Sequence, residues 1–221
     1  MRRLALCVVL LASCAIPCAF AQEMTADQIL AKLDEKAKAF SSVQTSFTQR
    51  GVAKGVPTPE DFGTIVMAMS NGVPRILFDK TSTPPTRVLI DKGKGTAYFV
   101  DDNTFSARNV DPRSDQVMLS LLGFGTRAET IKKGYSAKAK GKEVIGGVQA
   151  VVLELDSIAE FTKAYQVVTL WLDPQTWTPV QTRLAETSRS YYQFNYSKVQ
   201  LNRPIPNGTF DLKMKPGAKK Q

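Results

Sequence analysis

Short runs of β-forming residues, each closed by turn-forming residues, restrict the fold of this chain more than any other feature. Apolar and polar residues roughly alternate from Val43 to Gln49, as in a strand with one buried face. Turn chemistry such as Asn71-Gly72, Gly93-Lys94-Gly95 and Asp173-Pro174-Gln175-Thr176 separates later runs. Because short strands joined by tight turns pair with their neighbours, the pattern predicts an antiparallel meander. The further strands that we expect are Gly63–Met69, Arg75–Asp79, Arg87–Asp91, Thr96–Val100, Thr104–Asn109, Val148–Asp156, Tyr165–Leu172, Pro179–Glu186 and Tyr191–Val199, with Phe210 in a short last strand.

One helix is expected before the first strand, from Thr25 to Phe40. Thr25 and Gln28 have the spacing of a capping box. An apolar stripe at helical spacing follows, so one face of this helix is expected to pack on the core. The stripe consists of Ile29, Leu33, Ala37 and Phe40.

A second, shorter helix is expected from Asp111 to Phe124, between two groups of strands. Asp111 can cap it, Pro112 suits its first turn and Gly125 suits its end. The segment is unusually apolar, which fits either a helix packed on the core or a mobile lid over a cavity, although most apolar helices belong to cores. The apolar residues are Val117, Met118, Leu121, Leu122 and Phe124.

The N-terminus has the order of a secretory signal peptide. Arg2 and Arg3 precede an apolar run that is too short to span a bilayer, and Ala19-Phe20-Ala21 supplies a cleavage pattern. We therefore expect a signal peptide at residues 1–21, a single domain at residues 22–221 and a periplasmic location. Alternatively, Leu11-Ala12-Ser13-Cys14 resembles a lipobox, in which Cys14 would be lipidated.

The expected mature chain lacks the side chains of most catalytic and metal sites. The sequence has no histidine, and Cys7, Cys14 and Cys18 all precede the expected cleavage site. This composition excludes Ser-His-Asp triads, Cys-His pairs, and zinc or copper sites built on imidazole or thiolate. Carboxylate-only catalysis remains open, but no pattern places an acidic pair in a cleft. We expect a protein that is not an enzyme and has no metal and no cofactor.

The chain is basic, with a formal net charge of +9. Without Arg2 and Arg3, 27 Lys and Arg face 20 Asp and Glu, a net charge of +7. A basic surface can meet nucleic acid, anionic lipid or acidic proteins, and is most often simply solvated. After export we expect no nucleic-acid partner.

Five stretches of the chain, in order, carry a resemblance to one known family. Each motif is weak alone, and their order over nearly the whole expected mature chain is the signal. They resemble the outer-membrane lipoprotein carrier family (the LolA type), although Ile76 stands where that family usually has tryptophan. The stretches are Phe40-Ser41-Ser42-Val43 with Phe47-Thr48-Gln49, then Arg75-Ile76-Leu77-Phe78 before Pro84 and Pro85, then Gly93 to Val100, then Leu172-Asp173-Pro174 with Pro179-Val180, and finally Asn202, Ile205, Phe210 and Pro216-Gly217.

The resemblance implies a mainly β fold, a curved incomplete antiparallel β-barrel, or half-barrel, covered by a few helices. An apolar cavity would lie between sheet and helices and hold acyl chains, although the same side chains would equally suit a filled core. The apolar helix above would then be the lid. The inward residues that we expect are Phe47, Ile65, Met67, Ile76, Phe78, Leu89, Tyr98, Leu153, Leu155, Val168, Leu170, Tyr192 and Phe194.

The resemblance also implies a role and partners. Arg75 matches an arginine that the family ties to lid closure and cargo transfer, whereas without the resemblance it would be a surface ion-pair residue of little weight. The implied function is a monomeric periplasmic carrier that takes an acylated lipoprotein or lipid from an inner-membrane donor complex to an outer-membrane acceptor. A non-transport binding or sensor module on the same half-barrel is the alternative, because a fold does not fix a function.

Overall fold

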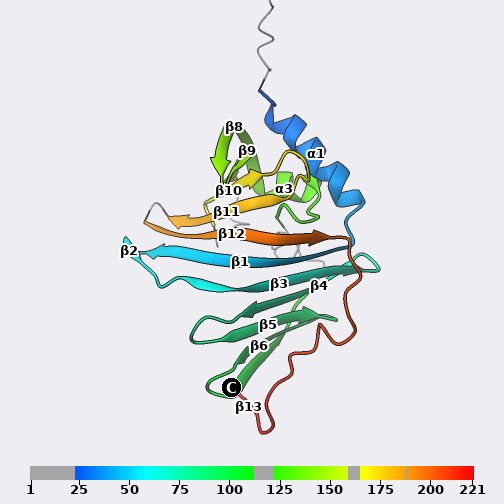
Figure 1. Ribbon diagram of the computed structural model, residues 1–221, viewed down its shortest axis with the longest axis vertical. Coiled ribbons are helices and arrows are strands. Elements are labelled where there is room, and N and C mark those ends of the chain that lie inside the picture. The colour runs from blue at the N-terminus through cyan, green and yellow to red at the C-terminus, as the bar shows by residue number, and fades with distance from the viewer. Residues whose placement is uncertain (1–22, 112–121, 159–164, 188) are drawn as a thin grey trace, which may run out of the picture.

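The computed structural model describes residues 23–111, 122–158, 165–187 and 189–221, and most of them belong to one large sheet (Figure 1). The strand order is β13-β7-β6-β5-β4-β3-β1-β12-β11-β10-β9-β8, with β2 paired to β1. All pairs are antiparallel except the short pair of β13 with β7. The described sheet is not closed, because β8 and β13 stand at opposite ends of this order, so the expected half-barrel fold is confirmed. The strands are β1 (Ser42–Ala53), β2 (Val56–Pro57), β3 (Asp61–Ser70), β4 (Val73–Lys80), β5 (Thr86–Asp91), β6 (Lys94–Phe99), β7 (Thr104–Asn109), β8 (Tyr135–Ile145), β9 (Val148–Ser157), β10 (Val167–Leu172), β11 (Pro179–Thr187), β12 (Ser190–Leu201) and β13 (Lys219–Lys220).

Helix α1 (Ala26–Lys38) begins at the capping box that its sequence predicts. The Thr25 side chain accepts a hydrogen bond from the Gln28 backbone N–H, and the Gln28 side chain accepts one from the Thr25 backbone N–H at 2.9 Å. These two bonds satisfy backbone donors that a helix start leaves open. The helix buries the predicted Ile29 and Leu33 together with Leu30, whereas Ala37 is half-buried and Phe40 lies beyond the helix end.

The tight turns also follow the sequence. Asn71 and Gly72 both have positive φ, at 52° and 73°, and they join β3 to β4. Lys92 and Gly93 do the same between β5 and β6, at 49° and 76°. Positive φ at both central residues matches the right-handed twist of paired strands, so these turns set the register of β3 with β4 and of β5 with β6.

Some sequence expectations were wrong or incomplete. Phe210 lies in a turn, and the last strand is β13, whose two residues pair with β7. Strand β8 and helix α3 (Ala128–Gly134) were missed. The inward positions of β8 include Ala137 and Ala139, and small residues alternating with lysines give little of the β-branched signal that identifies strands. Most of the helix expected at 111–124 lies outside the described residues, and Leu122 to Gly125 form turns.

Candidate functional site

One face of the sheet, here called the inner face, looks towards α1 and α3. Strand register places side chains on it because alternate residues point to opposite faces. Leu153 pairs with Leu170, Leu170 with Thr182, and Thr182 with Phe194, so these four positions share the inner face across β9 to β12. Met67, Ile76 and Ile90 line up in the same way across β3, β4 and β5.

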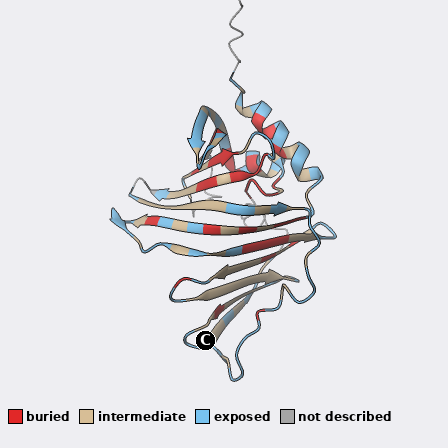
Figure 2. Ribbon diagram, viewed as in Figure 1, coloured by how far each residue is buried: buried red, intermediate tan, exposed pale blue. Residues whose placement is uncertain are grey.

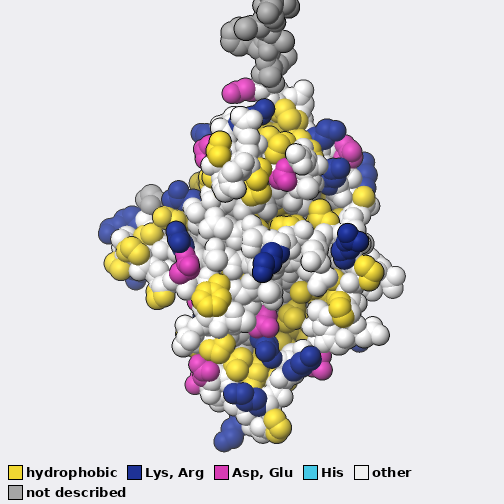
Figure 3. Space-filling view, viewed as in Figure 1, with side chains coloured by type: hydrophobic (Ala, Val, Ile, Leu, Met, Phe, Trp, Pro, Cys, Tyr) yellow, Lys and Arg dark blue, Asp and Glu magenta, His cyan; other side chains and the backbone are white. Residues whose placement is uncertain are grey.

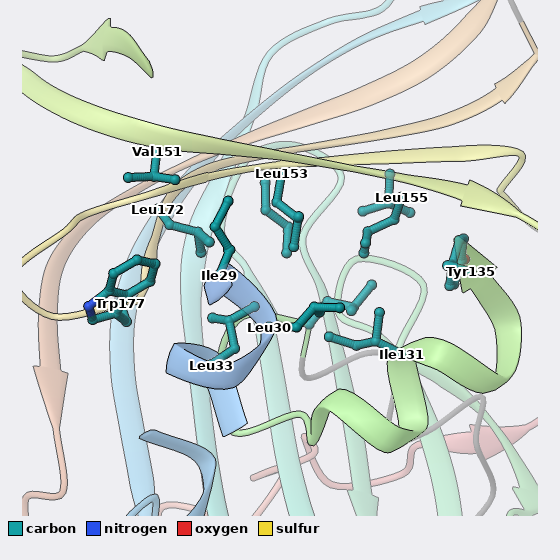
Figure 4. Close-up of a cluster of buried hydrophobic side chains, with 13 residues drawn as sticks. Ile29, Leu30, Leu33, Ile131, Tyr135, Val151, Leu153, Leu155, Leu172 and Trp177 are labelled. Carbon is teal, nitrogen blue, oxygen red and sulfur yellow. The ribbon is translucent and has the colours of Figure 1, made fainter. Parts of the chain in front are cut away.

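The part of the inner face on β8 to β10, the covered half, is a closed core. Ile29, Leu30 and Leu33 of α1 and Ile131 of α3 pack against the sheet (Figure 4). The sheet residues below them have no exposed surface, so this half is filled by the protein's own side chains. These fully buried sheet residues are Leu153, Leu155, Val168, Leu170 and Leu172.

The part of the inner face on β12, β1 and β3 to β6, the aromatic half, carries a row of rings. The Phe47 ring stacks on Phe78 with centroids 4.6 Å apart and lies 5.8 Å from Phe194. Phe194 in turn stacks on Tyr196 at 6.4 Å. Phe124 meets Tyr196 edge-on at 5.1 Å. The row therefore continues from β4 through β1 to β12, with Phe124 packed on its end.

Several apolar side chains of the aromatic half are only half-buried. Phe47, Met67 and Ile76 form its buried centre, each less than a tenth exposed. Around that centre the inner face keeps partial exposure, and Figure 2 shows β4 to β6 mainly in the intermediate colour, in contrast to the buried segments of β9 and β10. The half-buried inner residues are Phe78, Val88, Ile90, Phe194 and Tyr196.

The hydroxyl end of Tyr196 is buried, although its side chain as a whole is half-buried. Burial raises the pKa of the Tyr196 phenol to about 12, and the neighbouring Thr182 hydroxyl offsets only part of the rise. A neutral phenol is favoured where the phenolate would lose its hydration, so the end of the ring row is a low-dielectric surface.

The structure brings eleven of the thirteen predicted inward residues to the inner face. Phe47, Ile65, Met67, Ile76, Phe78 and Phe194 lie in the aromatic half. Leu153, Leu155, Val168 and Leu170 lie in the covered half, where they pack under helices rather than line free space. Tyr192 shares the inner face by register, opposite Leu184 and Gly51.

The inward placement of Leu89 and Tyr98 was wrong. Leu89 pairs with Leu77, whereas its neighbours Val88 and Ile90 pair with the inner residues Phe78 and Ile76. The Tyr98 hydroxyl donates to Asn103 Oδ1 at 2.8 Å and accepts from the Lys215 backbone N–H at 3.1 Å. Both side chains therefore lie on the outer face, where the C-terminal segment buries Tyr98.

Arg75 also lies on the outer face, whereas Leu122 and Phe124, the described end of the expected lid, pack on the inner face. Its guanidinium donates to both carboxylate oxygens of Asp91, from Nε at 2.7 Å and from Nη2 at 2.8 Å. It also stacks over the Phe210 ring, 4.3 Å from the centroid. The arginine thus ties the C-terminal segment to the sheet.

Only the end of the predicted lid falls within the described residues. Val117, Met118 and Leu121 lie outside them. Leu122 joins the covered half and Phe124 the aromatic half, so the turn that carries them bridges the two. Gly125 has a φ of +88°, and a side chain there would meet the Phe40 ring at 2.4 Å. Glycine is required at this close approach.

The sequence reasoning missed Val88, Ile90, Thr182 and Tyr196. Tyr196 was within reach, because it continues the alternation of Tyr192 and Phe194 along one strand. Thr182 gave no signal, since threonine in a strand usually marks a solvent face.

Two pockets lie among the described residues, and the second borders Phe124 at the end of the ring row. One of about 360 Å³ is on the outer face, beside Ala68, Arg75 and Phe210. Another of about 260 Å³ lies at the end of α1, between Phe40, Thr126 and Trp177. Basic side chains are spread over the face shown in Figure 3 and are interspersed with acidic ones, so this view shows no single basic patch.

Two further features concern only the described residues. Within them, no three or more His, Cys, Asp or Glu side chains gather as metal ligands. None of the helices in the same ranges combines the length and apolar character that a membrane span needs.

Comparison with known proteins identifies the fold. No family model matches the chain, and no curated protein matches it either. Among solved structures, MucB of Pseudomonas aeruginosa in complex with MucA is 15% identical, with a TM-score of 0.52 over 84% of this chain and 60% of that chain. An uncharacterized conserved protein from Thermus thermophilus is 9% identical, with a TM-score of 0.57 over 89% of this chain and 98% of that one.

A putative outer membrane lipoprotein-sorting protein domain from Vibrio parahaemolyticus also matches, at 11% identity and a TM-score of 0.43 over 83% of this chain and 94% of that one. This chain spans only about three fifths of the MucB structures. At these identities the likeness shows the fold alone. The chain thus has the half-barrel fold that its resemblance to the LolA type implied.

Proposed function

We propose that this protein binds the acyl chains of a lipid or an acylated lipoprotein on the inner face of its aromatic half. The observation that carries the proposal is the row from Phe78 to Tyr196, an apolar wall that is only half-buried beside a fully closed core. An acyl chain exposed to water costs about 0.8 kcal/mol per CH₂ group. A concave wall of aromatic and aliphatic side chains recovers that free energy on contact.

The proposal extends to transport through the periplasm. The signal-peptide pattern and the family resemblance support export, uptake of cargo from an inner-membrane donor and delivery to an outer-membrane acceptor. Shielding a chain requires contact area and no bond-breaking step, so we propose a carrier rather than an enzyme.

A second candidate is a non-transport binding or sensor module. The likeness to MucB, which was crystallised with MucA, favours it, because that half-barrel occurs in a complex with another protein. The two candidates differ in what co-purifies. A carrier should retain lipid in native mass spectrometry of the gently purified protein, whereas a protein-binding module need not.

Matched tryptophan substitutions test the acyl site. Ile90→Trp fills the half-buried wall, so we expect at least a tenfold loss of affinity for a fluorescent fatty-acyl probe with little change in thermal unfolding. Leu153→Trp is the control in the closed core, where overpacking should cost about 1–3 kcal/mol of stability. Its affinity for the probe at temperatures where it is folded should stay close to wild type. A wild-type protein that binds no acyl probe would contradict the proposal.

A further inference from the structure

A buried hydroxyl lies where the covered half meets the aromatic half. Thr182 is on β11, between Leu170 of β10 and Phe194 of β12, and it is only 3% exposed. Its Oγ1 has no hydrogen-bond partner. Most buried hydroxyls are satisfied by protein or water, and an unsatisfied one lowers stability, so this group calls for an explanation.

A second hydroxyl lies beside it. Tyr196 is on the neighbouring strand β12 and belongs to the ring row, with Phe194 and Phe124 against its ring. Thr182 lies within hydrogen-bonding reach of the Tyr196 phenol and lowers its pKa, although Thr182 Oγ1 makes no hydrogen bond of good geometry. A tyrosine phenol is protonated at neutral pH, so Tyr196 can act as a donor.

Thr182 and Tyr196 place two hydroxyl donors beside the rings of this wall, and together they match one kind of ligand atom. A carbonyl oxygen has two lone pairs and can accept from both at once. The rest of the wall suits hydrocarbon. From β11 to β5 the inner face crosses five strand intervals, or about 24 Å at the usual spacing of strands, which accommodates an extended long acyl chain.

We propose that Thr182 and Tyr196 form a polar subsite for the carbonyl oxygen of the ester or amide that joins an acyl chain to its headgroup. The inference rests on the proposed acyl-binding function and adds an orientation to it. The carbonyl end lies at the boundary on β11 and β12, and the chain extends over Phe47, Phe78 and Ile90. Such a subsite distinguishes acyl groups from plain hydrocarbon, since an ether or alkane leaves both donors unsatisfied.

The test uses two ligands that differ only at this atom, ester-linked and ether-linked lysophosphatidylcholine of equal chain length. Each displaces a fluorescent fatty-acyl probe from the purified protein. We expect the wild type to prefer the ester by roughly fivefold to tenfold, the worth of one hydrogen bond. Thr182→Val should remove most of this preference, and Thr182→Ser should keep it. Tyr196→Phe should reduce it. Thr169→Val, on the opposite face of β10, is the matched control and should leave it unchanged.

Stability of the ligand-free protein gives an independent readout. Valine has the shape of threonine without the unsatisfied hydroxyl, so Thr182→Val should raise the melting temperature while it weakens ester binding. If Thr182→Val lowers the melting temperature and keeps the ester preference, the two hydroxyls satisfy each other and the subsite is overturned. Equal binding of ester and ether by the wild type overturns it as well, but leaves acyl binding standing. A wild type that binds neither ligand refutes the proposed function itself.

Discussion

The two halves of the sheet bury their inner faces to different degrees. In the covered half, Leu153 and Leu170 lie under α1 and α3 with no exposed surface. In the aromatic half, Phe78 and Ile90 have the same strand geometry and similar apolar character, yet they remain half-buried. The difference shows that strand pattern makes an apolar wall, whereas the helices packed on it decide whether the wall becomes a core or a binding surface.

The aromatic half is supported from its outer side instead. The C-terminal segment passes over that face, where Leu212 is 6% exposed and its carbonyl accepts from Arg87 Nη1 at 3.1 Å. Tyr98 is almost fully buried, and its hydroxyl accepts a hydrogen bond from the Lys215 backbone N–H. This outer cover stabilises β4 to β6 without occupying the inner face. A half-barrel can therefore keep one inner wall partly open because its opposite face is closed.

The largest loss of stability should come from truncating a buried side chain in the covered half. Leu153→Ala removes a fully buried side chain and should cost about 2–5 kcal/mol of unfolding free energy, measured by urea titration. Ile90→Ala, its counterpart in the aromatic half, should cost only about 1 kcal/mol, because the side chain is partly hydrated already. Equal losses would mean that the two halves are packed alike and would remove the basis of the comparison.

The second effect depends on pH and measures how dry the ring row is. Burial raises the Tyr196 pKa from 10.0 to about 12. Because the folded value lies above the unfolded value, this contribution to stability is complete below pH 10 and is lost as the pH rises through 12. The loss should reach about 2–3 kcal/mol, two pKa units of linkage.

Tyr196→Phe separates the contribution of Tyr196 to stability from those of the other groups that titrate in alkali. The stability difference between wild type and variant, followed by urea unfolding from pH 8 to 11.5, should shift in favour of the variant above pH 10. A difference that stays constant with pH would show that water reaches the phenol and that the aromatic half is wetter than its packing indicates.

The inner wall could largely be predicted from period-two alternation, and the exceptions have a physical reason. In Arg87-Val88-Leu89-Ile90-Asp91 three apolar residues are consecutive, so alternation alone cannot tell which face is inward. At Ala97-Tyr98 the larger residue was expected to point inward. The C-terminal segment, more than 100 residues later, buries it on the outer face instead. Local pattern carries no information on such a distant cover.

For the same reason, the sequence could not predict that the sheet divides into a covered half and an aromatic half. Leu153, Leu170, Phe78 and Phe194 all have the pattern of inward strand residues, and nothing local separates a filled core from a half-buried wall. The separation depends on where α1 and α3 dock. The contacts of Arg75 on the outer face could not be predicted for a similar reason, since its partner Phe210 is distant in the chain.

A third, smaller effect tests the outer cover of the aromatic half. Arg75→Ala removes the bidentate pair with Asp91 and the stacking on Phe210, and should cost about 1–2 kcal/mol. Since the side chain lies on the outer face, affinity for an acyl probe should remain within about twofold of wild type. Phe210→Ala should cause a smaller loss of stability, because it removes only the stacking on Arg75. Abolished binding with normal thermal stability would instead support the transfer role expected of this arginine.

The smallest effect concerns the contact that joins the two helices of the covered half. Arg127 Nε donates to Asp34 Oδ1 at 2.6 Å, and this contact connects α1 to the start of α3. Desolvation tends to raise the pKa of Asp34, but the hydrogen bonds from Arg127 and the Ala128 backbone, with the charges of Arg127 and Lys38, hold it below its usual value of 3.8. The contribution of this carboxylate is therefore present above its unfolded pKa and lost as the pH falls through its folded pKa.

Arg127→Ala should lower the melting temperature only slightly at pH 7, because the pair is solvent-exposed and screened by salt. The difference from wild type should shrink as the pH falls below 4, where protonation of Asp34 removes the same contact. Lys32→Ala, which breaks an i,i+3 pair within α1, is the matched control and should not alter hydrogen exchange in α3. Faster exchange of the α3 amides in Arg127→Ala would show that this one contact helps keep the covered half closed. Unchanged exchange would assign the closure to the apolar packing of Leu30, Leu33 and Ile131 alone.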